Sequence, residues 1–228
     1  MKTFTDIDAV VFDCDGVLLD SNLMKVEAFR RSALGLGFDR HDVESFTRWQ
    51  SNNFGQSRYV VFERLLAGDF GAVPAGATLE ELLRRYARDI AVGYHEVSET
   101  DGARELLGLL KHLPLYVVSA SDEQELREVF RALRLASYFQ AIYGSPSTKA
   151  QNLERVSGGL TAGSRVLFIG DAVADANAAA AVGMQFVFMS RHSLVREEMQ
   201  ERSLNGEFSQ IDSLRDLVTV ATSETRIS

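Results

Sequence analysis

The residues best suited to chemistry in this 228-residue chain stand where short apolar segments end. They are two aspartates after the first segment, a serine after the second, a lysine beyond a third and two aspartates after a fourth: Asp13, Asp15, Ser119, Lys149, Asp171 and Asp175. If the segments are parallel strands, their carboxyl ends share one edge of a sheet, where such proteins bind ligands. We therefore expect these side chains to form a single site.

Several carboxylates at one edge of a sheet repel one another unless a cation joins them. Mg²⁺ prefers oxygen ligands and keeps coordination positions for water and for phosphate oxygens. The acidic pattern therefore predicts Mg²⁺ as the cofactor.

The run Asp13-Cys14-Asp15-Gly16 predicts a division of labour between its two aspartates. Residues two apart in an extended segment point the same way, and Gly16 permits a sharp turn. One carboxylate can attack phosphorus and form an acyl-phosphate, while the other protonates the leaving oxygen and later deprotonates water. Lys149 and the Ser119 hydroxyl are suited to bind the phosphoryl oxygens.

Short apolar runs alternate with amphipathic stretches along the chain. Strands are predicted at residues 9–12, 115–118, 166–169 and 186–189, with a shorter one near 141–143 that leaves Lys149 in a loop. Between them, the spacing of Leu126, Val129, Phe130 and Leu133 and the alanine-rich segment 172–182 predict helices. Strand and helix in alternation indicate an α/β fold with a doubly wound parallel sheet, similar to a Rossmann fold.

The pattern changes between residues 21 and 95, where helical periodicity persists but apolar strand-like runs are absent. We predict a helical cap domain over residues 21–95, inserted into an α/β core domain made of residues 1–20 and 96–228. Asp20 and Ser21 are interpreted as N-caps of the first inserted helix.

Composition excludes several classes of partner. The chain has 24 lysines and arginines against 32 aspartates and glutamates, a formal net charge of −8, so neither nucleic acid nor an anionic membrane is an expected partner. The single cysteine, Cys14, favours a reducing cytoplasm. No apolar stretch approaches the roughly 18 residues of a membrane span, and the charged N-terminus is unlike a secretory signal.

Taken together, these motifs resemble those of the haloacid dehalogenase superfamily. Its first motif corresponds to Asp13-Cys14-Asp15-Gly16-Val17 followed by Asp20-Ser21, and its second to Val117-Val118-Ser119-Ala120-Ser121. The basic residue of the third motif corresponds to Lys149. The fourth motif corresponds to Gly170-Asp171-Ala172-Val173-Ala174-Asp175. All four occur in order, and the resemblance covers essentially the whole chain.

The resemblance implies specific roles for these residues. Asp13 would be the nucleophile and Asp15 the acid/base, with Mg²⁺ bound by the Asp13 side chain, the Asp15 backbone carbonyl and Asp171. Asp175 would be a further metal ligand through water, or would orient the other ligands. In the insert, Gly55-Gln56-Ser57-Arg58 is similar to a specificity loop whose arginine meets a distal anion of the substrate. The candidate substrate contacts are Gly16, Asn22, Lys25, Arg58, Ala120 and Ser121.

Departures from the family patterns narrow the set of reactions and substrates expected for this chain. The dehalogenases and the phosphonoacetaldehyde hydrolases lack the aspartate that stands here as Asp15. The sugar-phosphate mutases place a histidine where this chain has Lys25. Lys149 is followed by Ala150 rather than by the proline common in phosphoglycolate phosphatases, which counts against phosphoglycolate as the substrate.

The interpretation that follows is a Mg²⁺-dependent phosphatase for a small phosphorylated metabolite, a sugar phosphate or a phosphorylated hydroxy acid. An intramolecular sugar-phosphate mutase, similar to the β-phosphoglucomutases, is the first alternative. A non-catalytic phosphate-binding regulatory module is the second, and the protein is expected to be a monomer or a homodimer.

Overall fold

A parallel sheet lies at the centre of the molecule. The structure is a computed structural model that describes residue 4 and residues 6–225. Within them, six strands lie in the order β3-β2-β1-β4-β5-β6, and every neighbouring pair is parallel. The strands are β1 (Ala9–Phe12), β2 (Leu115–Asp122), β3 (Ala141–Ser145), β4 (Val166–Gly170), β5 (Gln185–Met189) and β6 (Ser209–Ile211). The predicted doubly wound α/β fold is confirmed.

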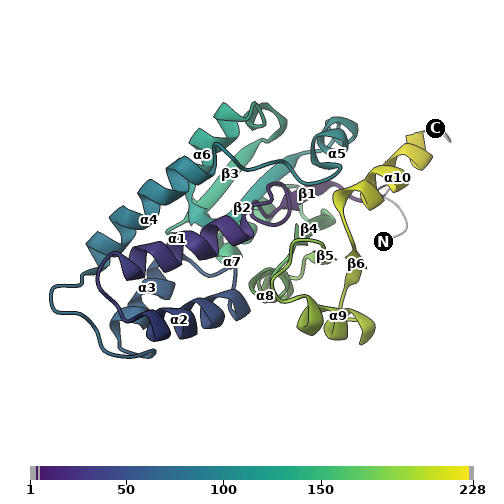
Figure 1. The fold of residues 1–228 in the computed structure, drawn as a ribbon. Helices are drawn as coiled ribbons and strands as arrows, with labels where there is room; N and C mark the ends of the chain where they lie inside the picture. The colour runs from purple at the N-terminus through teal and green to yellow at the C-terminus, as the bar shows by residue number, and fades with distance from the viewer. Residues whose placement is uncertain (1–3, 5, 226–228) are drawn as a thin grey trace.

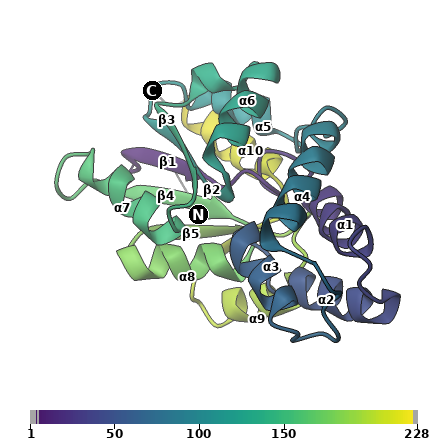
Figure 2. The same ribbon diagram turned by 90° about the vertical axis from the view of Figure 1, so that its left-hand side faces the viewer.

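Helices cover both faces of this sheet (Figures 1 and 2). In β1, Val10 and Phe12 belong to one hydrophobic cluster, whereas Ala9 and Val11 belong to the other. The first cluster takes in residues of α5 (Ala103–Leu109), α6 (Glu123–Ala132) and α10 (Leu214–Thr225); the second takes in residues of α7 (Lys149–Gly158), α8 (Val173–Val182) and α9 (Arg196–Leu204). Burial on both faces explains why β1 is an uninterrupted apolar run.

Four helices follow β1 before the chain returns to the sheet: α1 (Asn22–Leu34), α2 (Arg40–Asn52), α3 (Arg58–Leu66) and α4 (Leu79–Gly93). Figures 1 and 2 show them gathered on one side of the sheet. Aromatic side chains join them, with the Phe29 ring 5.0 Å from that of Phe62 and 4.3 Å from that of Tyr86. Their buried residues belong to the same hydrophobic cluster as Val10 and Phe12, so the insert packs continuously with the core.

Several local predictions were wrong. Strand β2 runs on to Asp122, past Ser119, and its register with β3 shifts between Val118 and Asp122. Lys149 lies in the first turn of α7 rather than in a loop, because Thr148 caps that helix with its side chain. The short strand β6 was missed, since Ser209 and Gln210 carry no apolar signal.

The connections explain where a ligand belongs. Strand β1 has β2 on one side and β4 on the other, so the winding of the chain reverses at β1. Crevices form at the carboxyl ends of strands where such a reversal occurs. Among the described residues, no helix combines the length and apolar character needed to cross a membrane.

Candidate active site

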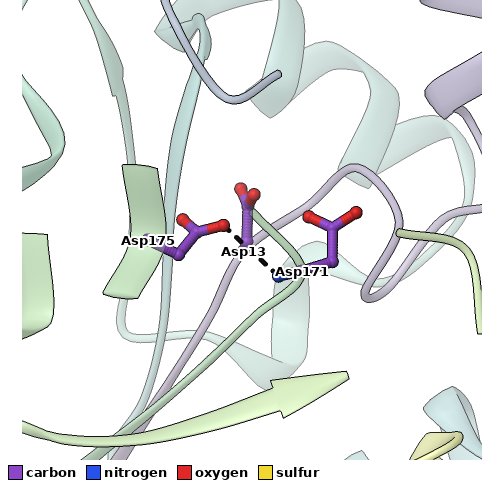
Figure 3. Close-up of side chains that lie close together, drawn as sticks. All are labelled: Asp13, Asp171 and Asp175. Carbon is purple, nitrogen blue, oxygen red and sulfur yellow. Dashed lines mark hydrogen bonds between the residues drawn. The ribbon is translucent and has the colours of Figure 1, made fainter. Parts of the chain in front are cut away.

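Three aspartates meet at the carboxyl edge of the sheet (Figure 3). Asp13 follows β1, Asp171 follows β4 and Asp175 lies in the first turn of α8. Each offers a carboxylate oxygen within 4.8 Å of the oxygens of the other two, and all three residues are buried. Asp175 is held by the backbone N–H groups of Asp171 and Ala172, which donate to its Oδ2 at 3.3 and 3.1 Å.

Lys149 joins two of these carboxylates. Its buried ammonium donates to Asp13 Oδ2 at 2.8 Å and to Asp175 Oδ1 at 2.5 Å. Burial opposes the charged form, but the two carboxylates outweigh it and raise the pKa of Lys149 above its usual value. Lys149 is therefore a fixed cation beside the proposed nucleophile, and Cys14 N–H donates to the other oxygen of Asp13 at 2.7 Å.

The donor set fits a divalent metal ion. Three carboxylates and one ammonium sum to −2, which one dication would neutralise. Burial, opposed by Lys149 and reinforced by Asp175 and Asp15, raises the pKa of Asp13 to about 7. Burial and the carboxylates of Asp13 and Asp175 raise the pKa of Asp171 as well. Asp171 Oδ1 is buried without a hydrogen-bond partner among the described residues, as expected for an atom reserved for a cation.

Asp15 has a different environment from the other acids of the site. Its carboxylate accepts hydrogen bonds from the Lys25 ammonium, from the Ser21 hydroxyl at 2.5 Å and from the Tyr94 hydroxyl at 2.9 Å. Ser121 donates to it as well, at 3.0 Å. Burial opposes ionisation, but the Lys25 charge and these hydrogen bonds outweigh it and lower the pKa of Asp15. Asp15 is therefore held as a carboxylate, apart from the three-aspartate cluster.

Gly16 makes the turn between these two environments possible. Its φ of +77° is unfavourable for residues with a side chain. A Cβ at this position would lie 2.1 Å from Asp171 Oδ2 and 2.4 Å from Asn22 Nδ2. The turn therefore brings the backbone directly against the Asp171 carboxylate.

The residues proposed as substrate contacts divide into two groups. Lys25, Arg58, Ala120 and Ser121 line one cavity together with Asp13, Asp15, Ser119 and Lys149. Gly16 and Asn22 are not in this lining. Asn22 instead donates to Asp171 Oδ2 at 2.6 Å and to the His192 carbonyl at 2.9 Å, so it holds a carboxylate of the three-aspartate cluster in place.

The inserted helices and the segments at the carboxyl ends of the strands both line this cavity, which is small, at about 30 Å³. The insert supplies Lys25, Gln50 and the backbone of Gly55, where an added Cβ would lie 3.7 Å from Lys149 Nζ. A volume of this size holds one or two water molecules. In the described conformation the proposed catalytic groups are nearly inaccessible to solvent, since Asp13 is 2% exposed, Asp15 4% and Lys149 7%.

Four residues with a part in the site were missed or misassigned from the sequence. Ser21 begins α1 but makes no side-chain cap, because its hydroxyl binds Asp15 instead. Tyr94, Gln50 and Glu125 carry no local sequence signal. Tyr94 binds Asp15, Gln50 lines the cavity, and Glu125 pairs with Arg58.

Comparison with known proteins agrees with this geometry. The model of the haloacid dehalogenase-like hydrolases matches residues 7–183. A phosphoglycolate phosphatase of Photorhabdus laumondii is 25% identical over 196 residues, 80% of each chain. One from Shigella dysenteriae is 26% identical over 215 residues, 80% of this chain and 81% of the relative.

Solved structures share the fold across nearly the whole chain. A haloacid dehalogenase-like family protein from Streptococcus pneumoniae superposes with a TM-score of 0.72 at 23% identity, covering 94% of this chain and 98% of that protein. A predicted phosphatase from Clostridium acetobutylicum gives 0.72 at 21% identity, covering 93% and 97%. On its sequence match and its fold, this chain belongs to the haloacid dehalogenase-like hydrolase family.

Proposed function

We propose that this protein is a Mg²⁺-dependent phosphatase that hydrolyses a small phosphorylated metabolite through an aspartyl-phosphate on Asp13. The observation that carries the proposal is the pairing of Asp13 with Lys149 at 2.8 Å inside a cluster of carboxylates, with Asp15 held separately. The names of the phosphoglycolate phosphatase relatives support a phosphate monoester as the substrate class. A cytoplasmic location is part of the same proposal.

The first chemical step transfers the phosphoryl group to the enzyme. An oxygen of Asp13 forms a bond to phosphorus as the bond from phosphorus to the leaving oxygen breaks. Lys149 and the Ser119 hydroxyl bind the equatorial phosphoryl oxygens. A proton on Asp15 passes to the leaving alkoxide, which departs as an alcohol.

The second step returns the enzyme to its starting state. Asp15, now a carboxylate, takes a proton from water, the water oxygen attacks phosphorus, and the bond from phosphorus to Asp13 breaks to release inorganic phosphate. The ionised Asp15 of the described structure is in the state this second step requires. The first step requires the protonated state, so the proposal implies that contact with Lys25 loosens while substrate enters.

Asp13, Asp171 and Asp175 would hold the metal ion, and Asn22 orients Asp171 for that purpose. The Asp15 backbone carbonyl would add a further oxygen ligand. When bound, the ion neutralises negative charge on the carboxylates and on the phosphoryl oxygens. Closure of the insert keeps bulk water away from the phosphorylated aspartate.

A phosphate-release assay tests the proposal. We expect Mg²⁺-dependent release of inorganic phosphate from p-nitrophenyl phosphate and from members of a panel of phosphorylated metabolites. Conversion of a sugar phosphate into its isomer without net release would instead support a mutase. No turnover of any compound in the panel, with phosphate still bound, would support a non-catalytic module.

A further inference from the structure

The wall of the cavity opposite the catalytic carboxylates comes from the inserted helices. We call it the outer wall, formed by Gln50 of α2, Arg58 of α3 and Tyr86 of α4. A cavity of about 30 Å³ is too small for a substrate, so the insert must move outward to admit one, and a phosphate bound at Asp13 and Lys149 then lies on the sheet side. Its leaving group therefore meets the outer wall, and the chemistry of that wall selects the substrate.

Arg58 carries the charge that would recognise a second anion, but that charge is already engaged. Its Nη1 donates to Glu125 Oε1 at 2.8 Å and its Nη2 donates to Glu125 Oε2 at 2.5 Å. The guanidinium carbon also lies 4.7 Å from the centre of the Tyr86 ring. Such a two-pronged contact uses both oxygens of the carboxylate and leaves the pair without net charge.

The other cations that line the cavity are also paired. Lys25 contacts the Asp15 carboxylate, and Lys149 contacts Asp13 and Asp175. A leaving group with its own carboxylate would thus meet no uncompensated positive charge on the outer wall.

Gln50 places a buried acceptor without a hydrogen-bond partner on the outer wall. Its side chain is only 3% exposed, it lines the cavity, and its Oε1 makes no hydrogen bond with the residues that the structure describes. A buried acceptor of this kind is stabilised when a ligand donates to it. A hydroxyl group both donates and accepts, so it satisfies the amide in either of its orientations.

We propose that the outer wall selects a neutral, hydroxyl-bearing leaving group, with Gln50 as the residue that binds the hydroxyl and Glu125 as the residue that cancels the charge of Arg58. The inference rests on the proposed phosphatase function. It differs from the sequence-based expectation that Arg58 meets a distal anion of the substrate. The preferred substrate is then a phosphorylated polyol or sugar rather than a phosphorylated acid.

A matched pair of substrates tests the selection directly. Hydroxyethyl phosphate and phosphoglycolate have the same two-carbon skeleton and differ only in a hydroxymethyl group against a carboxylate. We expect wild-type kcat/KM to be at least about tenfold higher for hydroxyethyl phosphate, because only its leaving group can donate to Gln50 without adding charge. The kcat/KM for hydroxyethyl phosphate should also exceed the kcat/KM for ethyl phosphate, which has no hydroxyl.

Two variants assign the roles. Glu125→Gln leaves the charge of Arg58 uncompensated and is expected to shift the selectivity ratio about tenfold toward phosphoglycolate. Gln50→Leu is expected to lower the ratio of hydroxyethyl phosphate to ethyl phosphate about tenfold, chiefly through KM. Glu128→Gln on the exposed side of α6 and Asn52→Leu at the exposed end of α2 are the matched controls and should change neither ratio.

The outcomes separate this inference from the proposed function. Hydrolysis of p-nitrophenyl phosphate with a preference for phosphoglycolate over hydroxyethyl phosphate would overturn the inference and leave the phosphatase in place. The inference is likewise wrong if Gln50→Leu leaves the hydroxyethyl-to-ethyl ratio unchanged. Absence of phosphate release from every compound would overturn the phosphatase, and the inference with it.

Discussion

The ammonium of Lys25, on the first inserted helix, contacts the carboxylate of Asp15, on the turn that follows β1. Both side chains are buried, with 7% and 5% exposed, so little solvent screens the pair. Lys25 also donates to Ser121, and its ammonium lies 5.7 Å from the centre of the Tyr94 ring. The insert thereby sets the protonation state of the acid/base that we propose for catalysis.

This pair predicts that Lys25→Met changes which chemical step limits turnover. Without the lysine, burial raises the pKa of Asp15, so Asp15 can still protonate a leaving group but no longer takes a proton from water. We expect kcat to fall about 10²-fold, with a burst of alcohol product and accumulation of a hydroxylamine-sensitive phosphoryl label on Asp13. Rapid-quench measurements would show both.

The exposed Lys111 supplies the control, because Lys111→Met removes the same charge far from the site. It should show neither the burst nor the label. If Lys25→Met also turns over without a burst, Lys25 does not act through Asp15 in the second step.

Asp13→Asn should lower the rate of phosphate release at least about 10³-fold, because an amide oxygen does not form the acyl-phosphate on which turnover depends. The assay is release of inorganic phosphate from p-nitrophenyl phosphate, with phosphoryl labelling of the protein as a second readout. Asp8→Asn, on the exposed residue just before β1, should retain wild-type rates. Wild-type activity in Asp13→Asn would rule out the aspartyl-phosphate mechanism.

Metal removal should separate activity from stability. We expect a chelator to abolish turnover and Mg²⁺ to restore it. Mg²⁺ should also raise the Tm of the wild-type protein, since a ligand at 100 times its Kd stabilises the native state by about 2.7 kcal/mol. Asp171→Asn should lose this rise, yet in the chelator it should melt above wild type because one of three crowded carboxylates is gone.

The exposed Asp69 provides the reference for this experiment, since Asp69→Asn should keep the Mg²⁺-dependent rise in Tm. An Asp171→Asn protein that Mg²⁺ stabilises as much as wild type would show that the ion binds elsewhere.

Gly16→Ala tests the contact between the turn and the Asp171 carboxylate, which we propose binds the metal ion. The new Cβ would overlap Asp171 Oδ2 and Asn22 Nδ2, so we expect loss of Mg²⁺ binding and a clear drop in the free energy of unfolding. Gly37→Ala has a similar φ, +84°, but no atom lies within 4 Å of its Cβ position. It should cost only the left-handed backbone strain, about 1–2 kcal/mol.

The free energies of unfolding of the two glycine variants, measured with denaturant, separate the steric clash at Gly16 from the backbone strain that both variants share. Equal losses at Gly16 and Gly37 would mean that the close approach to Asp171 has no energetic weight.

The fold and the polar residues at the carboxyl edge were accessible from the sequence because both depend on local pattern. Runs such as Val10-Val11-Phe12 can be buried on both faces only in a covered parallel sheet. The motif that contains Asp13 and Asp15 follows such a run directly, so its place at the sheet edge follows from the strand. Strand β6 escaped prediction because a three-residue edge strand has too little apolar surface to leave a pattern.

The partners of the site residues were not accessible in this way. Arg58 and Glu125 are 67 residues apart, and their ion pair joins α3 of the insert to α6 of the core. Ser21 is a residue type that often caps helices, but its hydroxyl donates to Asp15 instead. Local sequence offers no means of choosing between two acceptors that only the packing of distant segments brings within reach.

The sequence by itself determined the class of fold, the residues that we propose perform the chemistry and the family, since strand patterns and motif spacing are local properties of the chain. Tertiary structure alone decided the electrostatic state of those residues. It paired Lys25 with Asp15, cancelled Arg58 with Glu125 and left the Gln50 carbonyl oxygen without a partner in the cavity. The reason is physical: charge and hydrogen bonding in a buried site depend on distances of a few ångströms, and those distances are set by packing between elements far apart in the sequence.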